Sequence, residues 1–383
     1  MRVSKSIWFK TIVAGTMTAG LIGLASAADA ENYAGTAYVA GMGGHFAKAV
    51  FKIDPKAETP ISISSLGKVD IGTAKSHPTH DARIDHSTNI MYWSTYKPDA
   101  NADKQYHYGS IDLKTDKVTK DVTVPMPATT LNNAAGYCAS AQTKDYFMPI
   151  TMMKPGYISV IRKSDMKLLH NVFLEGTEAD IKKGYKYYHG INSPDMKEIL
   201  ITINESDTAP DNKELGNTVG KLHLIVLDAA SLEQGKVKVL RKGVVDGNAK
   251  KSVSFRQYYS PDGKLIANAT GDTLFIVDAK TLQVIDAEPM PALEETHDAI
   301  FTPDSKYVIA TSRTKSPNPD CKEPTKPADG EWTMDGQLKL YDVAAKKFVG
   351  KATSTCLACH DKELGPAAAH AVLCGLDVTF AKK

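Results

Sequence analysis

Residues 297–309 read HDAIFTPDSKYVI, which is two runs of strand-forming residues on either side of a Thr-Pro-Asp-Ser turn. Shorter copies of this pattern recur along the chain, namely YSPDGKLI at 259–266, HGINSPD at 189–195 and HDARID at 80–85. Each copy is followed by a strand that ends in Asp, at 338–342, 274–278, 224–228 and 109–112 respectively. The repeated unit is therefore strand, turn, strand, loop, strand, turn and strand.

A four-stranded sheet of this kind cannot bury both of its faces by itself. Radial stacking of several sheets buries each face against a neighbour, and this is how a β-propeller is stabilised. The repeat therefore predicts an all-β chain folded as a β-propeller, with full units that start near residues 80, 133, 189, 255 and 297. A pair of packed sheets in a β-sandwich, the alternative, does not account for a repeat of about fifty residues.

The two ends of the chain complement each other. Residues 369–373 (AHAVL) look like one further first strand, without the three strands that should follow it. Strands expected at 37–41, 47–54 and 61–66 would complete this blade from the N-terminal side. A blade shared in this way leaves no open sheet edge. We therefore predict a single domain over residues 31–383 with six blades, although seven blades also fit the pattern.

Residues 1–30 have the pattern of a secretory signal peptide. Arg2, Lys5 and Lys10 precede an apolar run from Ile12 to Ala27, which ends in small residues suited to cleavage. An uncleaved membrane anchor is the alternative. We expect a cleaved signal and a periplasmic protein that meets the membrane only through this signal.

Composition and charge exclude several classes of protein. Hydrophobic residues make up 42% of the chain and charged residues 23%, which excludes disorder and a bundle of membrane spans. The formal net charge is only +2, and the basic residues are scattered along the chain. We therefore expect no nucleic-acid partner.

Residues 356–360 read CLACH and carry the strongest chemical signal. Two thiols three positions apart, followed directly by His, suit the attachment of both vinyl groups of a haem and an imidazole below its iron. The motif resembles that of c-type cytochromes, and export makes covalent haem attachment available. This resemblance implies haem c, with thioether bonds to Cys356 and Cys359 and with His360 as the proximal ligand. A disulfide or an incidental pair of cysteines is the alternative.

The position of the motif is unusual for a cytochrome. Only 23 residues follow His360 and none of them is Met, so a separate cytochrome domain does not fit. We expect the haem in an insertion over residues of about 350–370, between a last strand near Phe348 and a closing strand near His370. The sixth iron ligand would then be His370 or a Met from the propeller, or it would be absent. The methionines considered are Met152, Met153, Met290 and Met334.

Four histidines stand at one place in the repeat, at the beginning of a blade's first strand. They are His80, His189, His297 and His370. Because innermost strands line the channel of a propeller, these side chains are expected to converge on its mouth as ligands of a haem, copper or another metal. A structural hydrogen bond within each blade is the alternative. Four neighbouring residues could bind an anion or donate protons, namely Arg83, Tyr188, Arg256 and Tyr258.

The repeats also resemble the YVTN-type and haem-d-type propellers of secreted bacterial proteins. Similar propellers that carry or neighbour a c-haem include the cd-type nitrite reductases, whose second haem lies over the channel between histidines, and copper propellers whose histidines hold the metal. The resemblance implies a second haem or copper at the channel mouth and a small inorganic nitrogen or sulfur species as substrate. This chain departs from the nitrite reductases, because its haem motif is C-terminal and has no helical domain.

Two functions follow from these observations. The first is a periplasmic monohaem c-type cytochrome that exchanges electrons with a redox partner protein, with oxidoreductase activity if a second metal or haem site is present. The second is a non-catalytic propeller that binds haem or metal, or that serves maturation or docking. The remaining cysteines, Cys138, Cys321 and Cys374, allow one disulfide, for which a bridge between Cys321 and Cys374 is our expectation.

Overall fold

The computed structural model describes residues 32–102, 105–128, 136–152, 155–182, 184–207, 218–292, 294–314, 336–355 and 371–381. All of them belong to one compact unit, Glu31–Lys383. The expected signal peptide, residues 1–30, lies outside the described residues.

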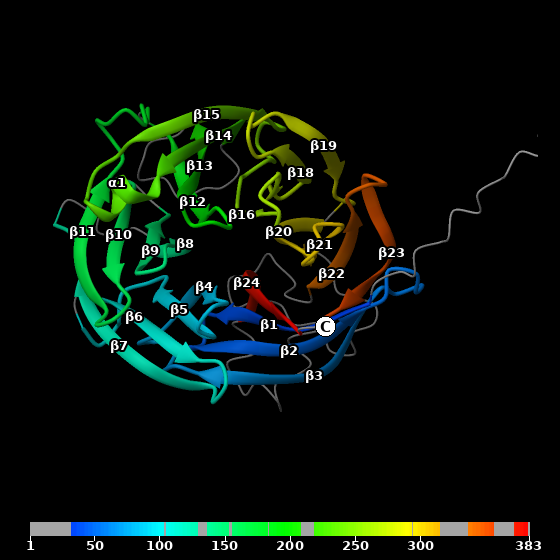
Figure 1. The fold of residues 1–383 in the computed structure, drawn as a ribbon, viewed down its shortest axis with the longest axis horizontal. Helices are drawn as coiled ribbons and strands as arrows, with labels where there is room; N and C mark the ends of the chain where they lie inside the picture. The colour runs from blue at the N-terminus through cyan, green and yellow to red at the C-terminus, as the bar shows by residue number, and fades with distance from the viewer. Residues whose placement is uncertain are drawn as a thin grey trace, which may run out of the picture. The chain divides into compact units, whose positions relative to one another are not determined.

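Six antiparallel sheets of four strands each are arranged around a common central axis, which we call the channel (Figure 1). The described residues form only strands, turns and loops apart from one short helix, and the prediction of a six-bladed β-propeller is confirmed. In order from the channel outward, the blades are β24 (Ala371–Phe380), β1 (Tyr33–Gly41), β2 (His45–Ile53) and β3 (Ile61–Asp70); β4 (Thr79–Asp85), β5 (Ile90–Thr95), β6 (Gln105–Asp112) and β7 (Lys117–Pro125); β8 (Tyr137–Gln142), β9 (Tyr146–Thr151), β10 (Tyr157–Arg162) and β11 (Lys167–Phe173); β12 (Lys186–Asn192), β13 (Glu198–Ser206), β14 (Thr218–Asp228) and β15 (Val239–Asp246); β16 (Arg256–Tyr259), β17 (Leu265–Ala269), β18 (Thr273–Asp278) and β19 (Val284–Pro289); and β20 (Glu294–Phe301), β21 (Tyr307–Thr314), β22 (Gln337–Asp342) and β23 (Lys347–Ser354).

The first blade takes its innermost strand from the C-terminal end of the chain. β24 pairs antiparallel with β1, with Gly35 opposite Phe380 and Gly41 opposite Ala371. Both edges of β1 are therefore occupied, by β2 and by β24, so β1 presents no free edge. The short helix α1 (Ala229–Glu233) follows β14. Among the described residues, no helix has the length and apolar character needed to cross a membrane.

The repeated turn residues form the same hydrogen bonds in different blades. Ser260 Oγ donates to Asp262 Oδ1 at 2.6 Å and accepts from the Leu265 N–H at 2.9 Å. Ser193 and Asp195 form the first of these bonds in the fourth blade at 2.6 Å. These side chains close the turn between a first and a second strand, which is the reason why the Ser-Pro-Asp pattern recurs at the same place in the repeat.

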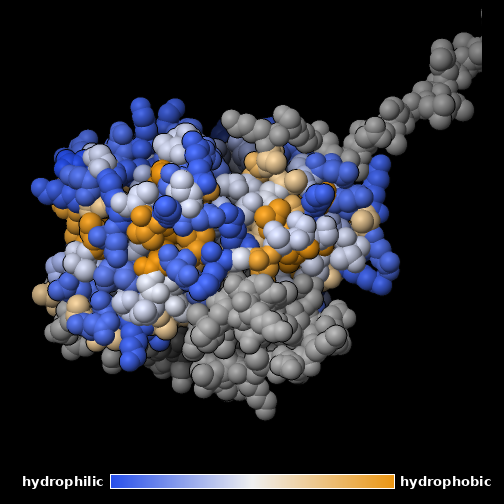
Figure 2. Space-filling model, turned by 90° about the horizontal axis from the view of Figure 1, so that it is seen from below, coloured by the Kyte–Doolittle hydropathy of each residue, from blue (hydrophilic) through white to orange (hydrophobic). Residues whose placement is uncertain are grey.

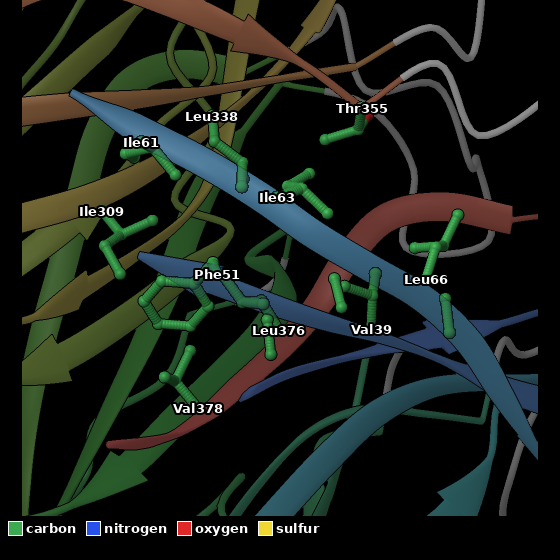
Figure 3. A pocket seen from close by; sticks show the side chains of 13 residues that line it. Val39, Phe51, Ile61, Ile63, Leu66, Ile309, Leu338, Thr355, Leu376 and Val378 are labelled. Atoms are coloured by element: carbon green, nitrogen blue, oxygen red, sulfur yellow. The ribbon is translucent and has the colours of Figure 1, made fainter. Parts of the chain in front are cut away.

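Apolar side chains fill the space between neighbouring blades. Figure 3 shows this packing between the first and the sixth blade, where side chains of β2, β3 and β24 meet Ile309 and Leu338. The space left among them is only about 30 Å³. A backbone hydrogen bond from Lys351 to Glu58, at 2.7 Å, also joins these two blades. The ring is therefore held at this junction by close packing and by backbone pairing.

The outermost strands face solvent. Figure 2 shows one side of the molecule, on which hydrophilic residues are interleaved with smaller groups of hydrophobic ones. Among the described residues, the large hydrophobic side chains that are exposed lie on β7, β15 and β19, namely Val118, Leu240, Val244, Val284 and Ile285. They are spread over three blades, so they do not form one continuous patch.

Replacing Gly375 by Ala should lower the free energy of unfolding by about 1–3 kcal/mol. Gly375 has φ +69°, and a Cβ atom there would lie 2.5 Å from the carbonyl oxygen of His80. Urea unfolding measures the change. Gly67→Ala is the matched control, because a Cβ at Gly67 meets nothing within 4 Å. Equal stability of the two variants would contradict the close approach of β24 to β4.

Candidate functional site

The six innermost strands all begin at the same end of the channel. Thr79 Oγ1, at the start of β4, donates to the Gly41 carbonyl at 3.0 Å, and Gly41 is paired with Ala371 at the start of β24. His80 Nδ1 lies 2.9 Å from Cys138 Sγ, near the start of β8. We call this the histidine end of the channel, and we call the opposite end, where the same strands finish, the funnel end.

Three of the four predicted histidines come together at the histidine end. The ring centroids of His80 and His297 are 6.0 Å apart. Phe255 stacks on His297 with a centroid distance of 4.5 Å and lies 6.4 Å from the ring of His189. His189 and His297 are buried and His80 is half-buried. His370 lies outside the described residues.

His297 has the most defined surroundings of the three. Its Nδ1 lies 2.9 Å from Asp298 Oδ2, and the ionised form of Asp298 accepts the Nδ1 proton. No other described residue shares a hydrogen bond with the ring, which leaves Nε2 with its lone pair. A carboxylate that fixes one ring nitrogen in this way orients the other nitrogen and makes it a better metal ligand.

The environment keeps the imidazoles of His80 and His297 neutral. Loss of water around the rings lowers the pKa of His80 and of His297 well below the usual histidine value, and the guanidinium groups of Arg256 and Arg313 lower both further. Burial raises the pKa of Cys138 to about 12, so this residue is a neutral thiol. The histidine end therefore offers neutral nitrogen donors at pH 7.

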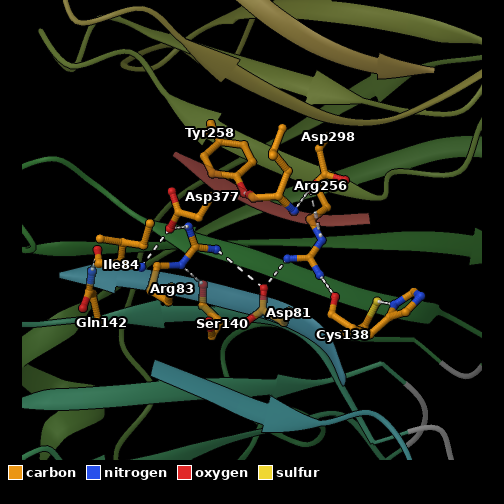
Figure 4. Close-up of polar contacts among 12 residues, drawn as sticks. Asp81, Arg83, Ile84, Cys138, Ser140, Gln142, Arg256, Tyr258, Asp298 and Asp377 are labelled. Carbon is orange, nitrogen blue, oxygen red and sulfur yellow. Dashed lines mark hydrogen bonds and ion pairs between the residues drawn. The ribbon is translucent and has the colours of Figure 1, made fainter. Parts of the chain in front are cut away.

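A buried network of charged side chains lies next to the histidines, towards the funnel end of the channel (Figure 4). It joins Asp81, Arg83, Arg256, Asp298 and Asp377, all of them buried. Arg256 contacts Asp81 through Nη1, and its Nε lies 3.6 Å from Asp298 Oδ1. Arg83 lies 3.6 Å from Asp377 and 3.9 Å from Asp81. The arginines that the sequence suggested as anion ligands are thus paired with carboxylates of the protein itself.

The network contains three carboxyl groups and two guanidinium groups. Burial raises the pKa of Asp298 to about 7, although the charge of Arg256 opposes this effect. A proton taken up by Asp298 brings the network towards neutrality, which reduces the cost of burying it. Tyr258, which the sequence suggested as an anion ligand or proton donor, donates its hydroxyl proton to the Leu376 carbonyl. Tyr188 is buried.

A cavity of about 950 Å³ opens at the funnel end. Its lining includes Arg83, His86, Gln142, Tyr258 and Asp377. Part of the lining comes from the repeated turn, since Pro194, Pro261 and Pro303 all face this cavity. The repeat did not predict a cavity at these turns, because a common position in the repeat does not show how far the turns of different blades lie apart. The charge network separates this cavity from the histidine end, since Asp81 and Arg83 lie between His80 and the funnel along β4.

The haem motif at 356–360 lies outside the described residues, but both neighbouring strands reach the histidine end. β23 ends at Ser354, which pairs with Gln337, and through β22 and β21 this register leads to Thr296, next to His297. β24 begins at Ala371, opposite Gly41. The connection between them thus begins after Ser354, later than the expected start near residue 350.

The other predicted ligands are placed as follows. Met152 and Met290 directly follow β9 and β19, at strand ends that belong to the histidine end. Met153 and Met334 lie outside the described residues, as do Cys321 and the side chain of Cys374, so the expected disulfide remains a prediction.

The fold and the channel define this chain as a six-bladed β-propeller with a histidine-bearing channel end. The sequence matches no family model and no curated protein. Among solved structures, the chain is similar to Pseudomonas aeruginosa periplasmic gluconolactonase PpgL, with 11% identity, a TM-score of 0.51, and coverage of 92% of this chain and 99% of that one. Kuenenia stuttgartiensis hydrazine synthase gives 15% identity, a TM-score of 0.46, and coverage of 73% of this chain and 66% of that one. The β-propeller domain of Myceliophteria thermophila Cps50 (Swd1) gives 10% identity, a TM-score of 0.40, and coverage of 72% and 87%. At these identities, the similarity establishes the fold alone.

Proposed function

We propose that this protein is an exported, periplasmic monohaem c-type cytochrome whose haem is carried by a β-propeller. In this proposal Cys356 and Cys359 form the thioether bonds and His360 is the proximal ligand. The supporting observation is that the strands on both sides of the CLACH segment reach the channel end where neutral histidines gather. When bound, the haem supplies a one-electron redox centre.

The donors at the histidine end fit a haem iron. His297 is neutral, its Nδ1 is held by Asp298, and Phe255 stacks on its ring. These are the properties of an imidazole prepared to bind iron through Nε2. We therefore assign His297 as the sixth ligand, in preference to His80 and His189. His80 Nδ1 already forms a hydrogen bond with Cys138 Sγ.

This assignment favours electron transfer over catalysis. A filled sixth position leaves no place for a substrate at the iron, so the protein would exchange electrons with a redox partner protein. The catalytic form of the proposal, oxidation or reduction of a small inorganic nitrogen or sulfur species at the channel mouth, requires an open position or a second metal. In the described part of the chain, the donor atoms of the three channel histidines do not gather within 4.8 Å of one another. They therefore give no support to a copper ion held by all three.

Replacing His297 by Ala should change the ferric haem from six-coordinate low-spin to five-coordinate high-spin, because the variant lacks the assigned ligand. Optical absorption and electron paramagnetic resonance measure the spin state, and added imidazole should restore the low-spin spectrum. His189→Ala is the matched control, since His189 is a buried histidine of the same channel end. An unchanged spectrum in the His297 variant would show that another residue, such as His370, is the sixth ligand.

The non-catalytic alternative is a maturation or docking propeller. Redox behaviour distinguishes it from the electron-transfer proposal. A carrier should be reduced and reoxidised reversibly in a potentiometric titration and should pass electrons to a partner cytochrome. A docking protein with a bound haem but without electron exchange would contradict the electron-transfer function while leaving the haem attachment intact.

A further inference from the structure

A second cluster of metal-ligand side chains lies in the second blade. His77 comes from the connection before β4, His107 from β6 and Asp121 from β7. Their donor atoms all lie within 4.8 Å of one another. Among the described residues, no other group of three histidine, cysteine or acidic side chains meets this condition.

Both imidazoles point one nitrogen at the same carboxylate. His77 Nε2 lies 2.9 Å from Asp121 Oδ2, and His107 Nδ1 lies 2.8 Å from Asp121 Oδ1. The two rings are 4.0 Å apart between centroids. The histidines are buried, whereas the Asp121 side chain is 34% exposed, so the cluster is open to water on the side of the carboxylate.

In each ring, the nitrogen that does not face Asp121 forms a hydrogen bond with a further residue. His107 Nε2 lies 3.1 Å from Asp99 Oδ2, and His77 Nδ1 lies 2.8 Å from Ser76 Oγ. Asp99 is itself positioned by the backbone N–H of Asn101 at 2.8 Å. Histidines that bind metals commonly donate their second ring N–H to a carboxylate or another acceptor, which fixes the tautomer and the ring orientation.

We propose that His77, His107 and Asp121 bind one divalent first-row transition-metal ion. We choose Zn²⁺ as the probe for this site. Two imidazole nitrogens and one carboxylate are a donor set for such ions, and the exposed side of Asp121 leaves room for a water ligand. This site shares no residue with the channel, so it is independent of the proposed haem function.

Binding exchanges protons for the metal ion. The ion replaces the hydrogens that now lie between the two imidazoles and Asp121. In the metal-bound form, His107 keeps the proton on Nε2 and donates it to Asp99. His77 takes the tautomer in which Nδ1 donates to Ser76 Oγ. Any proton that the rings no longer hold passes to solvent, and no electron is transferred.

The test is Zn²⁺ titration of the full-length protein after treatment with a chelator, followed by isothermal calorimetry. We expect one tight site per chain. X-ray absorption at the zinc edge, where haem iron does not interfere, should show nitrogen and oxygen ligands at about 2.0–2.2 Å with imidazole scattering. A wild-type protein without a specific Zn²⁺ site would overturn the proposal.

Variants locate the site. His77→Gln and Asp121→Asn should each weaken Zn²⁺ binding by about 100-fold or more, and Asp99→Asn by about 10- to 100-fold with unchanged stoichiometry. His223→Gln is the matched control, because His223 pairs with a single carboxylate, Glu205, at 3.0 Å and should leave binding unchanged.

The channel histidines are the competing site. If His297→Gln removes Zn²⁺ binding while His77→Gln and Asp121→Asn retain it, the assignment is wrong. Circular dichroism and thermal unfolding of each variant show that the fold is intact. If His77→Gln does not fold, Asp121→Asn alone decides, because it removes a partly exposed ligand and keeps the side-chain volume.

Discussion

Serine at both Cys356 and Cys359 should abolish covalent haem attachment completely. Each thioether bond forms when a cysteine thiol adds across a vinyl group of the haem, and a serine hydroxyl does not replace the thiol in this reaction. The protein should be expressed with its export signal together with a haem-attachment machinery. Intact-mass measurement and haem staining of a denaturing gel then report attachment. The wild-type chain should carry the mass of one haem, and the double variant should show the bare polypeptide.

Controls separate this outcome from general misfolding. Cys321→Ser also removes a cysteine but should retain the haem, since Cys321 is not part of the CLACH motif. Circular dichroism of the double variant should keep the β-sheet signal, because the described blades do not include residues 356–360. Bare polypeptide in correctly exported wild-type protein would contradict the cytochrome function as a whole.

Arg256→Met should lower the free energy of unfolding by about 3–5 kcal/mol. The variant keeps much of the side-chain volume but removes the guanidinium group that Asp81 and Asp298 face. Their carboxyl groups are fully buried, so they lose a charge partner without gaining water. Such a loss is a large part of the total stability of a typical domain. Guanidinium chloride unfolding, followed by fluorescence, measures it.

Two comparisons decide whether burial is the cause. Arg162→Met removes an arginine that is paired with Asp165 on the surface, where both side chains are more than 40% exposed, so the variant should unfold at nearly the same denaturant concentration as the wild type. Combining Arg256→Met with Asp81→Asn should recover part of the loss, because the second change removes one of the unpaired charges. Equal effects of Arg256→Met and Arg162→Met would show that the channel network is solvated.

The fold could be predicted from the sequence because its signal is local and repeated. The Ser-Pro-Asp turn closes through the hydrogen bonds of its own residues, as Ser260 and Asp262 show. Four strands per unit and the incomplete unit at 369–373 then led to six blades. In the structure, β24 occupies the inner edge of β1.

The histidine end was predictable in part. A shared position in the repeat places His80, His189 and His297 on equivalent strands, and equivalent strands converge on the channel. The protonation states of these histidines could not be predicted from the repeat. The neutral ring of His297 depends on burial and on the charges of Arg313 and Arg256. Arg313 comes from the neighbouring strand β21 and Arg256 from another blade.

The metal-ligand cluster of His77, His107 and Asp121 had no signal in the sequence. His107 does not stand at the position in the repeat that the four predicted channel histidines share, and 44 residues separate His77 from Asp121. Only the register between β6 and β7, and the return of the chain before β4, bring these three side chains together.

By itself the sequence determined the strand pattern of the repeat and the presence of a CLACH motif, because each of these depends on residues that are close together in the chain. It allowed six or seven blades, and the pairing of β24 with β1 decided for six. The tertiary structure alone decided that Arg83 and Arg256 pair with buried carboxylates, that a cavity opens at the funnel end, and that Asp298 binds one ring nitrogen of His297. These properties depend on the exclusion of water and on distances between different blades, and both arise only when the ring is closed.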